Sequence, residues 1–189
     1  MPEIYVIGGC NGSGKTTFAL NLFPNLANIE FINADIIAAR LNPDNPDAVA
    51  IPASRIMLQN LKSLARQKRD FAFETTLAAR TFAPFLRRCQ AEGYRVNLIY
   101  VWLNSVELAI ARVALRVASG GHDIPEDVIR RRYHRGRKNF LELYSKLADY
   151  WVAYDNTNPK RKLIAEKIPE TEVIIYQANI WQDIQQKSI

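Results

Sequence analysis

The chain has 189 residues, of which 48% are hydrophobic, so it is long enough to bury a core and too apolar to be disordered. Its formal net charge is +6, and its apolar runs, such as 96–103, are far too short to span a bilayer. The two cysteines, Cys10 and Cys89, fit neither a metal-binding spacing nor a disulfide framework, and residues 1–5 carry no secretory signal. We therefore expect a cytoplasmic protein. The length predicts a single domain over 1–189.

Strand and helix signals alternate along the chain, which predicts a mainly parallel sheet with helices on both faces. The predicted strands are 4–7, 29–33, 71–73, 96–103 and 151–154. The predicted helices are 16–22, 53–68, 81–92, 105–118 with Ser105 as its cap, and a longer one from Pro125. Because the run 96–103 is apolar on both faces, we place it at the centre of the sheet. The stretch 158–189 holds a predicted edge hairpin, 162–168 with 172–176, and a last short helix near Trp181.

The decisive motif is Gly-Cys-Asn-Gly-Ser-Gly-Lys-Thr at 9–16, which matches G-x-x-x-x-G-K-[ST] at every position. A predicted strand precedes it and a predicted helix follows it, as a phosphate-binding P-loop requires. Glycines let backbone N–H groups approach phosphate oxygens, and the start of the helix adds its positive end. We expect Lys15 to reach the β- and γ-phosphates of ATP and the Thr16 hydroxyl to ligate Mg²⁺. The expected ATP-binding residues are Gly9, Asn11, Gly12, Ser13, Gly14, Lys15, Thr16 and Thr17.

Two acids follow predicted strands, at the sheet edge where open α/β folds bind ligands. Asp35 comes after the second predicted strand and Glu74 after the third. Phosphoryl transfer needs a metal ion, positive charge and an oriented nucleophile, so both acids are candidates for the base and the metal shell. Thr75 and Thr76 are candidates for phosphate contacts. Each of these side chains has a plain alternative as a loop residue or a helix cap.

A basic helix–loop–helix is predicted over 112–138, which holds eight basic and three acidic residues. Arg112 and Arg116 share a helix face because they are four apart, and the glycines at 120–121 permit a hinge. The arginines at 130–132 begin the next helix. As a lid, these guanidinium groups would stabilise charge on a transferring phosphoryl group, although the patch also suits nucleic-acid phosphates or a solvated face. The sequence therefore predicts an α/β P-loop NTPase of nucleotide-kinase type, with a five-stranded, mainly parallel sheet and a helical arginine lid.

Four further motifs accompany the P-loop: Asn-Ala-Asp at 33–35, Phe-Glu-Thr-Thr-Leu at 73–77, Gly-Gly-His-Asp-Ile-Pro-Glu-Asp-Val-Ile-Arg-Arg-Arg-Tyr at 120–133, and Tyr-Asp-Asn at 154–156. With them, residues 3–157 resemble the compact bacterial zeta-toxin-like P-loop kinases. The resemblance implies an enzyme that uses ATP and Mg²⁺ to phosphorylate the sugar 3′-hydroxyl of UDP-N-acetylglucosamine. It also implies an antitoxin protein as a partner.

The same resemblance implies roles for individual residues. Lys15 would bind phosphate, and Asp35 would be the base that faces the acceptor hydroxyl. Glu74 and Thr75 would lie in the substrate region, and lid arginines would hold the γ-phosphate. The implied catalytic set is Lys15, Asp35, Arg116 and Arg132, and the implied substrate-binding set is Asp35, Glu74, Thr75 and Arg131.

Three functions remain open at this point. The first is a kinase of a small hydroxyl compound such as a UDP-sugar, and the second is a nucleoside or nucleotide kinase with a base-reading pocket. The third is an ATP-binding regulator without catalysis. Asp35 discriminates among them, because a regulator needs no acceptor base. We expect a small-molecule substrate rather than nucleic acid, and we expect His122 to be a loop residue rather than a catalyst.

Overall fold

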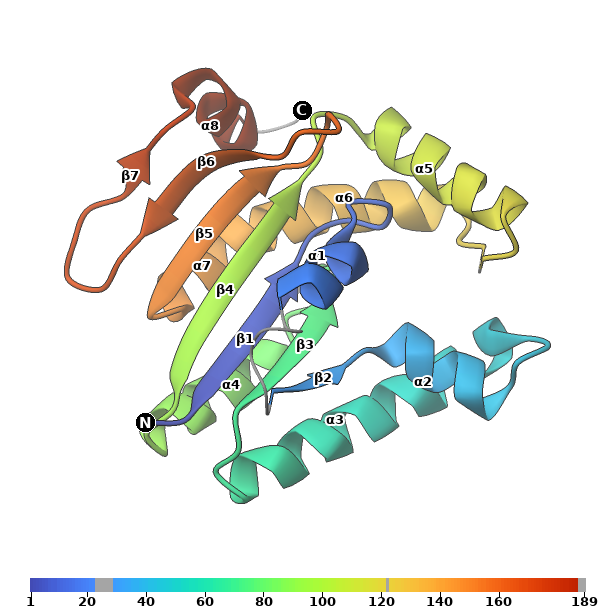
Figure 1. The fold of residues 1–189 in the computed structure, drawn as a ribbon, viewed down its shortest axis with the longest axis horizontal. Helices are drawn as coiled ribbons and strands as arrows, with labels where there is room; N and C mark the ends of the chain where they lie inside the picture. The colour runs from blue at the N-terminus through green and yellow to red at the C-terminus, as the bar shows by residue number, and fades with distance from the viewer. Residues whose placement is uncertain (23–28, 122, 187–189) are drawn as a thin grey trace.

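The computed structural model describes residues 1–22, 29–121 and 123–186 (Figure 1). The strands are β1 (Glu3–Gly8), β2 (Glu30–Ile32), β3 (Phe71–Thr75), β4 (Arg95–Trp102), β5 (Tyr150–Asp155), β6 (Lys162–Lys167) and β7 (Ile174–Ile175). The helices are α1 (Lys15–Leu22), α2 (Ala34–Leu41), α3 (Ala50–Arg66), α4 (Phe82–Ala91), α5 (Val106–Ala118), α6 (Glu126–Asn139), α7 (Ser145–Leu147) and α8 (Ala178–Gln185). Among these ranges, no helix combines the length and the apolarity needed to cross a lipid bilayer.

The described strands form one sheet in the order β2-β3-β1-β4-β5-β6-β7. Strands β1 to β5 pair in parallel, whereas β6 and β7 pair antiparallel at one edge. The expected α/β architecture is therefore confirmed. The expected count of five strands is wrong, because the predicted edge hairpin joins the same sheet and brings the total in the described chain to seven.

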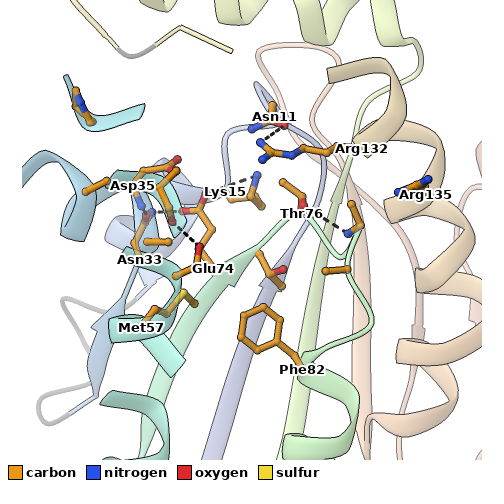
Figure 2. A pocket seen from close by; sticks show the side chains of 18 of the residues that line it. Asn11, Lys15, Asn33, Asp35, Met57, Glu74, Thr76, Phe82, Arg132 and Arg135 are labelled. Carbon is orange, nitrogen blue, oxygen red and sulfur yellow. Dashed lines mark hydrogen bonds and ion pairs between the residues drawn. The ribbon is translucent and has the colours of Figure 1, made fainter. Parts of the chain in front are cut away.

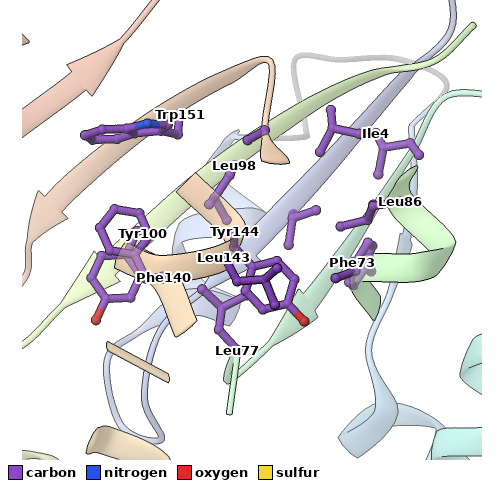
Figure 3. Close-up of a cluster of buried hydrophobic side chains, with 14 of the residues drawn as sticks. Ile4, Phe73, Leu77, Leu86, Leu98, Tyr100, Phe140, Leu143, Tyr144 and Trp151 are labelled. Atoms are coloured by element: carbon purple, nitrogen blue, oxygen red, sulfur yellow. The ribbon is translucent and has the colours of Figure 1, made fainter. Parts of the chain in front are cut away.

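Strand β4 lies at the centre of the sheet, as its apolar run predicts, and every residue after Arg95 in it is buried. One face of the sheet packs against α3, α4, α8 and the segment that follows α6, through side chains that include Leu61 of α3. Figure 3 shows Leu86 and Phe140 in the same cluster. The other face packs against α1 through Phe18 and Ala19. Helices thus cover both faces, and the carboxyl ends of β1 and β3 come together beside the start of α1 (Figure 1).

The structure confirms the predicted starts of α5 and α6. The Ser105 Oγ accepts a hydrogen bond from the Leu108 N–H at 3.2 Å, so Ser105 caps α5. Pro125 directly precedes α6, and Glu126 and Asp127 occupy its first turn, where the helix dipole favours acids. After α6 the chain continues through a π-helical segment, Phe140–Tyr144, into α7.

Three local features differ from the expectations. Helix α2 is not predicted by the sequence pattern, and it places Asp35 in the first turn of a helix rather than in a loop. Glu74 and Thr75 are the last residues of β3 rather than a loop after it. Pro52 lies inside α3, as its third residue, where backbone N–H groups have no intrahelical partner and a proline costs little.

Candidate active site

The P-loop connects β1 to α1 and is enclosed by two other parts of the fold. Gly12 has a φ of +73°, and a Cβ there would lie 2.7 Å from the Ala109 carbonyl oxygen of α5. Gly14 has a φ of +85°, and a Cβ there would lie 2.6 Å from Asn156 Nδ2. Only glycine meets both the backbone angle and the close approach at these positions. The loop is therefore held as a compact turn in front of α1.

Lys15 is the charged residue of the loop, and it is buried, with 5% of its surface exposed. Its ammonium donates a hydrogen bond to the Cys10 carbonyl oxygen at 2.8 Å and lies 3.5 Å from Glu74 Oε1. A buried cation needs such anionic and polar partners. Burial raises the pKa of the adjacent Cys10 thiol to about 11, so this cysteine stays neutral and acts as an apolar filler.

Glu74 is the point at which the site residues meet (Figure 2). Its Oε2 accepts hydrogen bonds from Thr16 Oγ1 at 2.7 Å and from Asn33 Nδ2 at 2.8 Å. Together with its contact to Lys15, these bonds join β2, β3 and α1. A hydroxyl and a carboxylate side by side are hard oxygen donors, which is the donor set that Mg²⁺ prefers. Thr16 and Glu74 therefore fit a magnesium ion at the P-loop.

The loop also fits phosphate. The Ser13 hydroxyl is buried and has no hydrogen-bond partner among the residues that the structure describes. It stands in the turn that precedes α1, where backbone N–H groups and the helix N-terminus attract anions. Phosphate oxygens would complete the hydrogen bonding of this turn and give Lys15 a second anionic neighbour.

A cavity of about 470 Å³ opens beside the P-loop. It brings together eight of the residues expected from the sequence: Asn11, Lys15, Asp35, Glu74, Thr75, Thr76, Arg131 and Arg132. Asp35 is exposed at its rim, near the start of α2 (Figure 2). Figure 2 shows the apolar side chains of Met57 and Phe82 on the side away from Lys15 and Arg132, and Ala38 and Ala78 also line the cavity. The cavity thus has a charged end at the loop and an apolar end away from it.

The lid arginines divide into two groups. Arg132 donates to Asn11 Oδ1 at 3.5 Å, which places its guanidinium at the P-loop (Figure 2). Arg131 lines the cavity and pairs with Asp127 at 3.6 Å. Arg116 is exposed on α5 and does not line the cavity. The structure therefore brings Arg131 and Arg132 to the site and leaves Arg116 outside it.

The other expected residues have these positions. Gly9, Gly12, Ser13 and Gly14 form the turn before α1, and Thr16 and Thr17 lie in its first turn, outside the cavity lining. His122 lies outside the described residues.

Three polar side chains at the site were assigned no role from the sequence, although Asn33 and Asn156 belong to two of the motifs described above. Asn33 bonds Glu74, as already described. Asn156 directly follows β5. Its Nδ2 donates a hydrogen bond to the Ser13 carbonyl oxygen at 2.8 Å, which links the P-loop to the end of β5. Arg135 lines the cavity and makes no hydrogen bond or ion pair with the described part of the chain. The sequence could have indicated Arg135 as a site residue, because it lies one helical turn after Arg131 and so shares its helix face.

Thr76, Ala78 and Ala79 line one wall of the cavity, and the stretch 76–79 is hydrogen-bonded to the end of α6 and to the segment that follows it. Asn139 donates from Nδ2 to the Leu77 carbonyl oxygen at 2.8 Å and to that of Ala78 at 3.2 Å. The Tyr144 hydroxyl donates to the Ala79 carbonyl oxygen at 2.7 Å. At Gly136, a Cβ would lie 2.3 Å from the Thr76 carbonyl oxygen, so α6 touches this wall directly.

Several known proteins are similar to this chain in sequence or in fold. An uncharacterised protein of Haemophilus influenzae is 37% identical over 125 residues, which are 66% of this chain and 88% of that protein. The crystal structure of AvrRxo1-ORF1:-ORF2 with ATP contains a chain that matches with a TM-score of 0.80 and 16% identity, over 100% of this chain. This chain spans only 65% of the length of that one.

A second solved structure, from the PezAT chromosomal toxin–antitoxin system of Streptococcus pneumoniae, matches with a TM-score of 0.63 and 16% identity. The match covers 98% of this chain and 85% of that one. At such low identity these two structures establish the fold alone. The sequence model of the zeta toxin family matches residues 1–167. The chain therefore belongs to the zeta toxin family.

Proposed function

We propose that this protein is an ATP-dependent phosphotransferase that moves the γ-phosphate of ATP to a hydroxyl group of a small molecule. The observation that carries the proposal is the shared cavity, in which the P-loop lysine, Lys15, and two carboxylates, Asp35 and Glu74, face the same space. A phosphate donor site and an acceptor site must adjoin in this way, because transfer depends on holding the two reactants in line.

Each side chain has a role that follows from its contacts. Lys15 holds the β- and γ-phosphates, which become its second anionic neighbour beside Glu74. Thr16 and Glu74 would hold Mg²⁺, which would neutralise charge on the phosphate oxygens. Asp35, at the rim, accepts a hydrogen bond from the acceptor hydroxyl and orients it. Arg132, next to Asn11, stabilises the charge that develops on the transferring group.

For the acceptor, we propose UDP-N-acetylglucosamine or a related sugar nucleotide. Membership of the zeta toxin family supports this choice, and so does the position of Arg131, which can face the phosphates of such a substrate. An antitoxin protein is the partner that we propose on the same ground. The PezAT match supports it, because that structure comes from a toxin–antitoxin system.

A nucleoside or nucleotide kinase is the second candidate. The apolar end of the cavity favours it, because Met57 and Phe82 offer a surface on which a planar base can pack. The chemistry and the roles of Lys15 and Asp35 would be the same. The two candidates differ only in which part of the acceptor enters the apolar end.

The test is a product search with the purified protein, ATP and Mg²⁺. A panel of UDP-sugars, nucleosides, nucleotides and phosphorylated metabolites is screened for a mass gain of one phosphate. Lys62→Ala serves as a control, since Lys62 is exposed on α3 and does not line the cavity. We expect product with a UDP-sugar from the wild type and from this control. Product from nucleosides or nucleotides alone would favour the second candidate, and ATP binding without any product would leave a regulator.

A further inference from the structure

We propose that Asn33 is a positioning residue that fixes the acceptor-side acid, Asp35, relative to Glu74 at the metal side. This inference rests on the proposed function, because it concerns how two of its acids are held. Asn33 belongs to none of the residue sets expected from the sequence. It is buried, with 6% of its surface exposed, between the end of β2 and the start of α2.

The register of the sheet brings Asn33 to Glu74. Strands β2 and β3 are parallel, with Ile32 opposite Phe73, so the next residue of each strand comes to the same edge. Side chains alternate between the two faces of a strand. Ile32 and Phe73 face the cluster under α3 and α4, and therefore Asn33 and Glu74 face α1 and the P-loop.

The two ends of the Asn33 amide do different work. Its Oδ1 accepts hydrogen bonds from the N–H groups of Asp35 at 2.7 Å and Ile36 at 3.3 Å, which caps α2. Its Nδ2 donates to Glu74 Oε2 at 2.8 Å. A backbone N–H can only donate and a carboxylate can only accept, so these partners fix the orientation of the amide. One planar group thus spans the start of the Asp35 helix and the Glu74 carboxylate.

Capping alone does not require asparagine here. Serine and aspartate cap helices about as well as asparagine does. Serine is too short to reach Glu74 while it caps, and aspartate would set a second carboxylate against it. The choice of asparagine therefore follows from the contact with Glu74, which is 41 residues away in the sequence.

The first arm of the test separates positioning from capping. Asn33→Ser keeps the cap and loses the donor, whereas Asn33→Ala loses both. We expect Asn33→Ser to lose about 2–4 °C of Tm, because the hydrogen bond to Glu74 is gone, and to lower kcat about 10-fold, with both KM values within about threefold. Asn33→Ala should lower kcat similarly and lose about 2–4 °C of Tm more than Asn33→Ser, because the cap is gone as well. Asn45→Ser is the matched control, because Asn45 caps an exposed turn through the Ala48 N–H at 3.3 Å, outside the cavity lining.

The second arm tests the contact itself without any acceptor. Asn33→Asp should lower Tm, because two carboxylates would face each other. Adding Glu74→Gln should restore most of that Tm, because the new amide can donate back to the new carboxylate.

The outcomes separate the claims. Wild-type kcat in a folded Asn33→Ser variant would reduce Asn33 to a cap and overturn the inference. A double variant no more stable than Asn33→Asp would also overturn it, because the contact with Glu74 would be absent. If the wild type transfers phosphate to no acceptor, the proposed function fails and the kinetic claim with it, while a rescued Tm would still establish the contact.

Discussion

Gly136 decides how closely the arginine-bearing helix α6 approaches the cavity wall. In Gly136→Ala, the new Cβ would lie 2.3 Å from the Thr76 carbonyl oxygen, whereas Cβ contacts below 3.0 Å are essentially never found. The helix or the wall must therefore move by about 0.7 Å, the difference between these two distances. The obstacle is a backbone atom, and Asn139 fastens the same stretch of backbone to α6, so neither side yields easily.

Two opposing terms set the stability of this variant. Alanine is a better helix former than glycine, which contributes about 1 kcal/mol in its favour. Forcing one extra methyl group into a packed contact costs about 1–3 kcal/mol, and a backbone obstacle puts the cost near the upper end. The net loss is about 1–2 kcal/mol. For a chain of this size it corresponds to a Tm lower by about 2–8 °C.

The same displacement should reach the chemistry, because Arg132 lies one turn before Gly136 on α6. A shift of about 1 Å in a catalytic group costs roughly 10²-fold, so about 0.7 Å should lower kcat on the order of 10-fold. Thermal denaturation and steady-state kinetics well below Tm measure the two effects. Lys138→Ala is the control, because it places alanine on the exposed side of α6 without a clash. A Gly136→Ala variant as stable and as active as the wild type would refute this account of the contact.

Three further predictions concern the proposed catalytic groups. Lys15→Ala should leave the fold intact and lower transfer by roughly 10²-fold or more in a product assay, because it removes the charge at the β- and γ-phosphates. Near-normal turnover would refute the proposal that the P-loop carries out phosphoryl transfer. Asp35→Asn should lower transfer by roughly 10²–10⁴-fold with ATP affinity within a few-fold, and recovery on adding Mg²⁺ would instead indicate a metal ligand. Arg132→Ala should lower kcat more than ATP affinity, whereas Arg116→Ala, outside the cavity, should have the smaller effect; the reverse order would contradict the positions seen on α5 and α6.

The parts of the fold that follow from local pattern could be predicted from the sequence. The P-loop motif, the apolar run of β4 and the Ser105 cap each depend on neighbouring residues alone. Helix α2 was not predicted in this way, because it has only eight residues, of which only Ala38 is fully buried and Ala34 and Ile37 are partly buried, and because it is stabilised by packing on α3. The two hairpin strands were recognised, but their addition to the main sheet depends on pairing with β5, which no local signal specifies.

The site residues also divide into those that follow from local sequence pattern and those that depend on the folded chain. Lys15, Asp35 and Glu74 follow from motif and strand order, and all three line the cavity. Asn33 and Asn156 act across 41 and 143 residues, so their partners appear only when the chain is folded. The roles expected for these residues remain predictions, since position alone does not measure them.

The ring cluster next to the π-helical segment has an optical consequence. The indoles of Trp151 and Trp181 stack with centroids 5.4 Å apart and an interplanar angle of 16°, and Phe140 meets both rings edge-on. Phe140 continues α6, while Trp181 belongs to α8, beyond the end of the zeta toxin match at residue 167. A coupled indole pair gives a strong near-ultraviolet circular dichroism signal and a shared emission. Because one neighbour of the pair, Phe140, directly follows the last residue of α6, a movement of α6 that shifts Phe140 would change these signals in unlabelled protein.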